Sequence, residues 1–96
     1  PSMTLIECQP ELDIASVEGL RRQILDALSA GEPLEVDGRA VRKVHAAALQ
    51  LFLSAVAEAR SLGVQWLWRE PSPALVEGAR LLGLTDHLML GDDRVG

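Results

Sequence analysis

The chain has 96 residues, with nine Lys and Arg against 14 Asp and Glu, so its net charge is -5. Hydrophobic residues make up 48% of it but aromatic ones only 3%, so Leu, Val, Ile and Ala must form the core. This length predicts one domain over residues 1–96. The acidic balance and scattered basic residues argue against nucleic acid or an anionic membrane surface as partner.

The single cysteine, Cys8, excludes an intrachain disulfide and a cysteine zinc site. This usage fits a reducing compartment, so we expect a cytoplasmic protein. The sequence shows no apolar run of membrane-spanning length, and we expect no membrane insertion. Residues 1–3 are expected to be partly an expression remnant ahead of Met3, and residues 91–96 a frayed tail.

The first predicted elements are a strand over residues 4–8 and a helix that follows Pro10. Ser16 is the expected N-cap of this helix, and Gly31 is the expected end of it. Its apolar residues recur at helical spacing, which predicts a buried stripe. The stripe comprises Val17, Leu20, Ile24 and Leu28.

A second strand is predicted over residues 33–37, and a second helix from Ala46 to about Leu62 with Gly63 as its stop. The apolar stripe of this helix comprises Leu49, Phe52, Leu53, Val56 and Ala59. Residues 64–68 predict a third strand. Two alternatives stay open for its tryptophans, which alternation places on one face: Trp66 and Trp68 belong to the core, or they form an exposed docking surface.

Ser72 and Pro73 predict the start of a third helix. Leu75, Val76, Ala79 and Leu82 are its expected buried residues. Residues 84–90 predict a final short helix or strand. The alternation of strands and helices predicts an α/β fold, a central and mostly parallel β-sheet with about four helices.

The sequence offers no catalytic constellation. It has no Gly-x-Ser-x-Gly motif, no glycine-rich phosphate loop, and only two isolated histidines, His45 and His87. Several His, Cys, Asp or Glu at ligand spacing would be needed for a metal site. We therefore expect no enzyme activity, no metal and no cofactor, and we interpret His87 as a surface residue.

Three segments of the chain resemble the STAS domain, the fold of anti-sigma factor antagonists. Residues 11–25, ELDIASVEGLRRQIL, look like its Gly-x-Leu-Asp segment and first helix, and residues 34–44, LEVDGRAVRKV, like its second strand and loop. Residues 68–84, WREPSPALVEGARLLGL, resemble its strand, Pro-Ser turn and following helix. These segments span residues 11–84, and the likeness as a whole covers residues 4–90, so the resemblance implies a STAS-like fold.

The resemblance also implies a degenerate phosphorylation site. The family's Asp-Ser-Ser-Gly-Leu loop falls on residues 45–49, His-Ala-Ala-Ala-Leu, where only Leu49 matches. His45 replaces the acid, and Ala46 and Ala47 stand where the acceptor hydroxyl would be. Asp13 matches the acidic residue that flanks the family's site. The predicted partner-binding residues are Asp13, Arg42, Lys43, His45, Ala46, Ala47, Gln50 and Ser54.

The function that this resemblance implies is a non-catalytic protein-interaction module without a Ser/Thr phospho-switch. Its expected partner is a histidine or serine kinase, an anti-sigma factor or an ABC ATPase. Residues 46–52, AAALQLF, look most like small bacterial STAS proteins that are encoded beside chemosensory (chemotaxis) kinase genes. Alternatives are phosphotransfer through His45 or Ser54, a subunit of a lipid-transport ABC system, a small-ligand site, and a homodimer.

Overall fold

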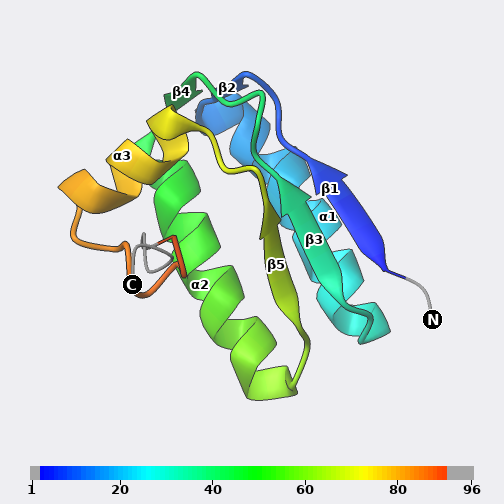
Figure 1. The fold of residues 1–96 in the computed structure, drawn as a ribbon. Helices are drawn as coiled ribbons and strands as arrows, with labels where there is room; N and C mark the ends of the chain where they lie inside the picture. The colour runs from blue at the N-terminus through cyan, green and yellow to red at the C-terminus, as the bar shows by residue number, and fades with distance from the viewer. Residues whose placement is uncertain (1–2, 91–96) are drawn as a thin grey trace.

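The computed structural model describes residues 3–90, which form a parallel sheet with helices on one of its faces (Figure 1). In chain order the elements are β1 (Thr4–Glu7), β2 (Glu11–Leu12), α1 (Ile14–Ala30), β3 (Leu34–Asp37), β4 (Lys43–Val44), α2 (Ala46–Leu62), β5 (Trp66–Arg69) and α3 (Pro73–Leu81). The expected remnant at residues 1–2 and the expected tail at 91–96 lie outside the described residues. The predicted α/β class is confirmed.

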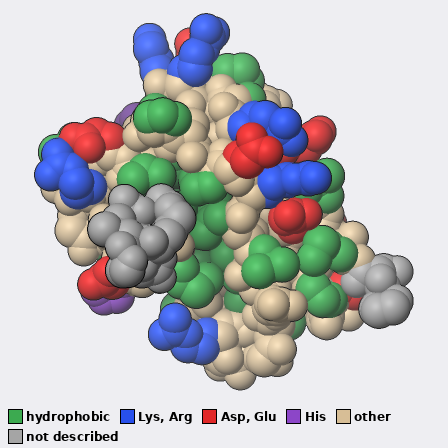
Figure 2. Space-filling model, in the orientation of Figure 1, with side chains coloured by type: hydrophobic (Ala, Val, Ile, Leu, Met, Phe, Trp, Pro, Cys, Tyr) green, Lys and Arg blue, Asp and Glu red, His purple; other side chains and the backbone are tan. Residues whose placement is uncertain are grey.

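The main sheet has the order β1-β3-β5, and both of its pairings are parallel. Side chains alternate between its faces, so every second residue is available to pack against the helices. Ile6, Val36 and Trp66 are buried on the helix-covered side, where α1 and α2 lie behind the sheet in Figure 1. Within the described residues, no helix covers the opposite face. Figure 2 shows that face, with apolar, acidic and basic side chains exposed on it.

Trp66 is a core residue and Trp68 is partly buried against the core, which favours the core alternative over an exposed docking surface. Trp66 is 6% exposed, and its ring meets the ring of Phe52 edge to face at a centroid distance of 6.3 Å. The rings of Trp68 and Phe52 lie 5.1 Å apart, also edge to face. The Trp68 Nε1–H donates a hydrogen bond of 2.7 Å to the carbonyl oxygen of Leu88. The tryptophans therefore join β5 to α2 and to the chain after α3.

The predicted helix ends are largely confirmed. Helix α2 spans the residues that the apolar spacing predicted, and α1 and α2 end at Gly31 and Gly63. These glycines have φ values of 73° and 72°, in the left-handed region where a Cβ would be strained. Ser72 caps α3 by accepting the N–H of Leu75 at 3.1 Å, with Pro73 as the first helical residue.

Four details of the sequence interpretation are wrong. Asp13, not Ser16, is the N-cap of α1. Leu82 is 48% exposed rather than buried, because α3 ends at Leu81 and the chain turns away. Residues 84–90 form hydrogen-bonded turns instead of a helix or strand, so residues 3–90 contain three helices and not about four. The two-residue strands β2 and β4 were not predicted.

None of the helices within residues 3–90 combines the length and the apolar character needed to cross a membrane.

Candidate functional site

The short ladder between β2 and β4 brings the starts of α1 and α2 together at one end of the molecule. The strands pair in parallel, with Leu12 beside Val44. The backbone N–H of His45 donates to the carbonyl oxygen of Leu12 at 2.8 Å, and that of Arg42 donates to Pro10 at 2.7 Å. Each strand leads directly into a helix, so the two N-caps lie next to each other (Figure 1).

Asp13 caps α1 through its carboxylate. Its Oδ1 accepts the backbone N–H of Ser16 at 2.9 Å, and this bond is the main cause that lowers the pKa of Asp13 below its ordinary value. The Ser16 hydroxyl donates to the carbonyl oxygen of Glu11 at 3.1 Å. A carboxylate at this position accepts an otherwise unpaired helix N–H, and its negative charge interacts favourably with the positive end of the helix dipole. The acidic residue that matched the family pattern therefore stabilises the start of a helix.

His45 caps α2 through its imidazole ring. Its Nδ1 accepts the backbone N–H of Ala47 at 3.0 Å, and only an unprotonated ring nitrogen can accept a hydrogen bond. In the neutral ring the proton then lies on Nε2. The side chain that replaces the family's acid thus performs the same capping contact that an aspartate oxygen would make.

The predicted contact residues fall into two groups that meet at Ala47. The helix-start group is exposed and comprises Asp13, Arg42, Lys43, His45 and Ala46. In Figure 2, basic side chains gather at the upper end of the molecule, where Figure 1 places β2 and β4. Gln50 and Ser54 are also exposed but lie further along α2. Residue 47 itself is half-buried.

Ala47, Gln50 and Ser54 line a groove of about 470 Å³ between α1 and α2. Apolar side chains from both helices form much of its wall, and charged side chains come from Arg21 on α1 and Glu58 on α2. The apolar lining comprises Val17, Ile24, Leu25, Leu28, Ala47, Leu51 and Ala55. This groove was not predicted, because the packing of α1 against α2 creates it.

Two exposed apolar residues extend the site beyond the predicted set. Ile14 is 65% exposed at the first position of α1, and Leu25, which lines the groove, is 46% exposed. The sequence contained a signal for Ile14, since a residue directly after an N-cap lies in the first helical turn and has few neighbours. With Ser16 as the expected cap, the sequence interpretation places Ile14 in the approach to the helix.

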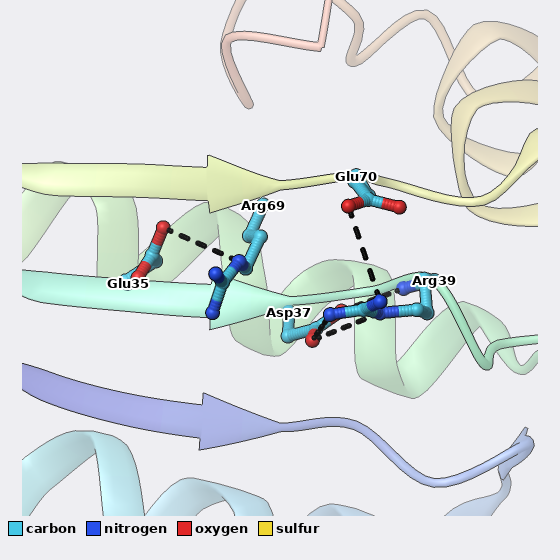
Figure 3. Close-up of polar contacts among 5 residues, drawn as sticks. All are labelled: Glu35, Asp37, Arg39, Arg69 and Glu70. Atoms are coloured by element: carbon cyan, nitrogen blue, oxygen red, sulfur yellow. Dashed lines mark hydrogen bonds and ion pairs between the residues drawn. The ribbon is translucent and has the colours of Figure 1, made fainter.

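A separate group of charged residues lies at the carboxyl ends of β3 and β5 (Figure 3). The side chain of Asp37 is 6% exposed and makes an ion pair of 2.9 Å with Arg39. Hydrogen bonds from the Arg39 side chain and backbone hold the pKa of Asp37 below its ordinary value. Arg39 also approaches Glu70 at 4.0 Å. The opposite charges in these pairs neutralise each other, so this group of residues stabilises the loop after β3.

The thiol of Cys8 is protected from reaction. Cys8 is buried, and burial together with the nearby negative charge of Asp37 raises its pKa to about 12. The thiol is therefore protonated near neutral pH and is a poor nucleophile. Among residues 3–90, no three His, Cys, Asp or Glu side chains come together to form a metal site. The exposed helix starts and the adjoining groove form one continuous surface.

Comparison with known proteins identifies one family. A family model described as "Mlab, STAS domain" matches residues 2–91. No match to a curated protein was found.

Proposed function

This chain belongs to the STAS domain family, and we propose that it is a protein-interaction module that binds a regulatory partner through the starts of α1 and α2. The partner is a kinase, an anti-sigma factor or an ATPase, in keeping with the anti-sigma factor antagonist-like character of the fold. Binding requires no phosphate on the module, because alanines occupy the two positions at the start of α2 where the family's hydroxyl would stand.

The observation that carries this proposal is the continuity of the exposed surface. The β2–β4 ladder fixes both helix starts, and Ala47 joins them to the α1–α2 groove. Small side chains at Ala46 and Ala47 allow a partner's backbone to approach the helix closely. Exposed apolar residues such as Ile14 supply contact area, and the surrounding charged and polar side chains form a rim, an arrangement typical of protein interfaces.

Interaction through this surface is tested by placing a charge at its centre. Ala47→Glu adds a long, charged side chain where the helix start meets the groove, while an acid in the first turn is compatible with the helix dipole. We expect partner affinity to fall by about tenfold or more, as expected when a charge is buried without a partner in an interface. The measurement is binding to purified candidates: the kinases, anti-sigma factors and ABC ATPases encoded beside the gene.

Ala57→Glu is the matched control, since Ala57 is an exposed alanine of the same helix that does not line the groove. It is expected to bind as the unmodified protein does. Equal affinity of Ala47→Glu and Ala57→Glu would contradict the assigned surface. Mass spectrometry after incubation with ATP and each kinase addresses the alternative: phosphate on His45 or Ser54 would identify a phosphotransfer protein instead.

A further inference from the structure

Strand β1 lies at an edge of the main sheet, and its outer side meets no other strand within residues 3–90. On its inner side, the N–H of Thr4 donates to the carbonyl oxygen of Pro33, the residue before β3, at 2.9 Å, and the N–H of Cys8, the residue after β1, donates to that of Asp37 at 3.0 Å. Backbone polar groups of a strand alternate between its two sides. The N–H and C=O groups of the odd-numbered residues, Leu5 among them, therefore point outward without a strand to bond.

Strand β1 itself carries no lysine or proline that would prevent pairing with another strand. Natural edge strands are often protected by lysine, by proline or by a covering segment. Residues 4–7 are Thr-Leu-Ile-Glu, with one charged residue at the end of the strand. Leu5 is 45% exposed, and so is Met3 just before the strand. The outward backbone groups are thus accompanied by exposed apolar side chains.

The sequence of β1 is complementary to itself in one antiparallel register. A twofold axis through Leu5 sets Leu5 against Leu5 of a second copy, and Met3 against Glu7. All of these residues have outward-pointing backbone groups, so each opposing pair can exchange two hydrogen bonds, with Cα atoms about 5.5 Å apart. A register centred on Ile6 would instead oppose inward-pointing groups. The outward direction of the odd-numbered backbone groups therefore favours the register centred on Leu5 over the one centred on Ile6.

The same register is favourable for side chains and charge. The two Leu5 side chains meet on the uncovered face of the sheet and shield each other from water. The two Glu7 side chains lie on opposite sides of the axis, four residues or about 13 Å apart, which exceeds the screening length in physiological salt. Each faces Met3 and not another acid. No like charges are directly opposed along the strand.

There is room beside β1 for an incoming strand. A groove of about 280 Å³ separates the strand from the side of α1, whose lining residues are Gln23, Asp26, Ala27 and Ala30. The helix therefore does not block the edge. From these observations we infer that two copies of this chain form a twofold dimer by antiparallel pairing of their β1 strands, giving a continuous six-stranded sheet.

A second copy is the occupant favoured by symmetry. A strand that pairs with itself across a twofold axis occupies the β1 edge of both chains, so this contact closes at two chains. This contact leaves the helix starts and the α1–α2 groove free, so it is independent of the proposed partner binding. The paired segment is short, which predicts a weak, concentration-dependent dimer.

The experiment is sedimentation equilibrium over a wide range of protein concentration, with matched leucine-to-lysine variants. The unmodified chain is expected to shift from the mass of one chain to the mass of two. Leu5→Lys sets two like charges against each other on the axis and should weaken association by about tenfold or more. Leu25→Lys makes the same change at a leucine of equal exposure on α1 (46% against 45%) and should dimerise normally.

A backbone readout distinguishes strand pairing from other contacts. On dimerisation, the Leu5 and Glu7 amide protons should become protected from hydrogen exchange, while the inward-pointing Thr4 amide is protected at every concentration. A chain that stays monomeric throughout, a Leu5→Lys variant that dimerises normally, or a dimer without protection of Leu5 would each overturn the inference. Loss of the dimer in Leu25→Lys with its retention in Leu5→Lys would overturn it in favour of the helical groove.

Discussion

Replacing His45 with alanine is expected to destabilise the protein by about 1 kcal/mol, the usual effect of removing an N-cap side chain. The structure assigns this loss to one contact, the 3.0 Å hydrogen bond from the Ala47 N–H to Nδ1 of His45. Without it, that helix N–H depends on water. For a domain of this size, about 1 kcal/mol corresponds to a decrease of ~4–8 °C in the melting temperature.

Urea unfolding followed by tryptophan fluorescence measures this effect, because Trp66 and Trp68 lie in the core against α2. The denaturation midpoint should fall while the slope m stays constant, since the surface exposed on unfolding hardly changes. His45→Asn is the control: its side-chain oxygen can accept the same N–H, and asparagine is among the best N-caps. If asparagine lowered the midpoint as far as alanine does, the capping role of His45 would be refuted.

The core and the buried thiol allow two further predictions. Trp68→Phe should destabilise the protein by about 1–3 kcal/mol more than Trp66→Phe, because it leaves the Leu88 carbonyl oxygen without the Trp68 donor. The Trp66 Nε1–H has no hydrogen-bond partner among residues 3–90, so equal urea midpoints for the two variants would contradict this. Cys8 should resist alkylation by iodoacetamide near pH 8 in the folded protein and react after unfolding in urea, because burial raises its pKa to about 12; rapid labelling of the folded protein, measured by mass spectrometry, would argue against a buried thiol.

The long helices were predictable because their signals are local and repeated. The apolar residues of α2 recur over several turns, and Gly63 marks an end that requires a left-handed conformation. The N-cap of α1 was harder to predict, since Asp13 and Ser16 lie only three residues apart and both side chains can cap a helix. The structure selects Asp13 because pairing of β2 with β4 keeps residues 11–12 extended, so that the helix starts at Ile14.

The remaining features depend on contacts between distant segments. A two-residue strand has no periodicity of its own, so β2 and β4 are visible only once they are paired. The α1–α2 groove likewise requires both helices to be in place. Leu82 illustrates the opposite error: its spacing fits the buried stripe of α3, but the helix ends one residue earlier. The ring of Phe52 contacts both tryptophans, and no local pattern could have indicated that contact.

The β2–β4 ladder has a consequence for how this surface can evolve. One residue inserted between β2 and α1, or between β4 and α2, would rotate the following helix start by about 100° and shift it by about 1.5 Å relative to its neighbour. The hydrophobic interior could re-form after such a change, yet Ile14 and Ala46 would no longer face the same neighbour. Segment length therefore constrains recognition here as strictly as amino-acid identity does, and relatives that bind the same partner should preserve both spacings.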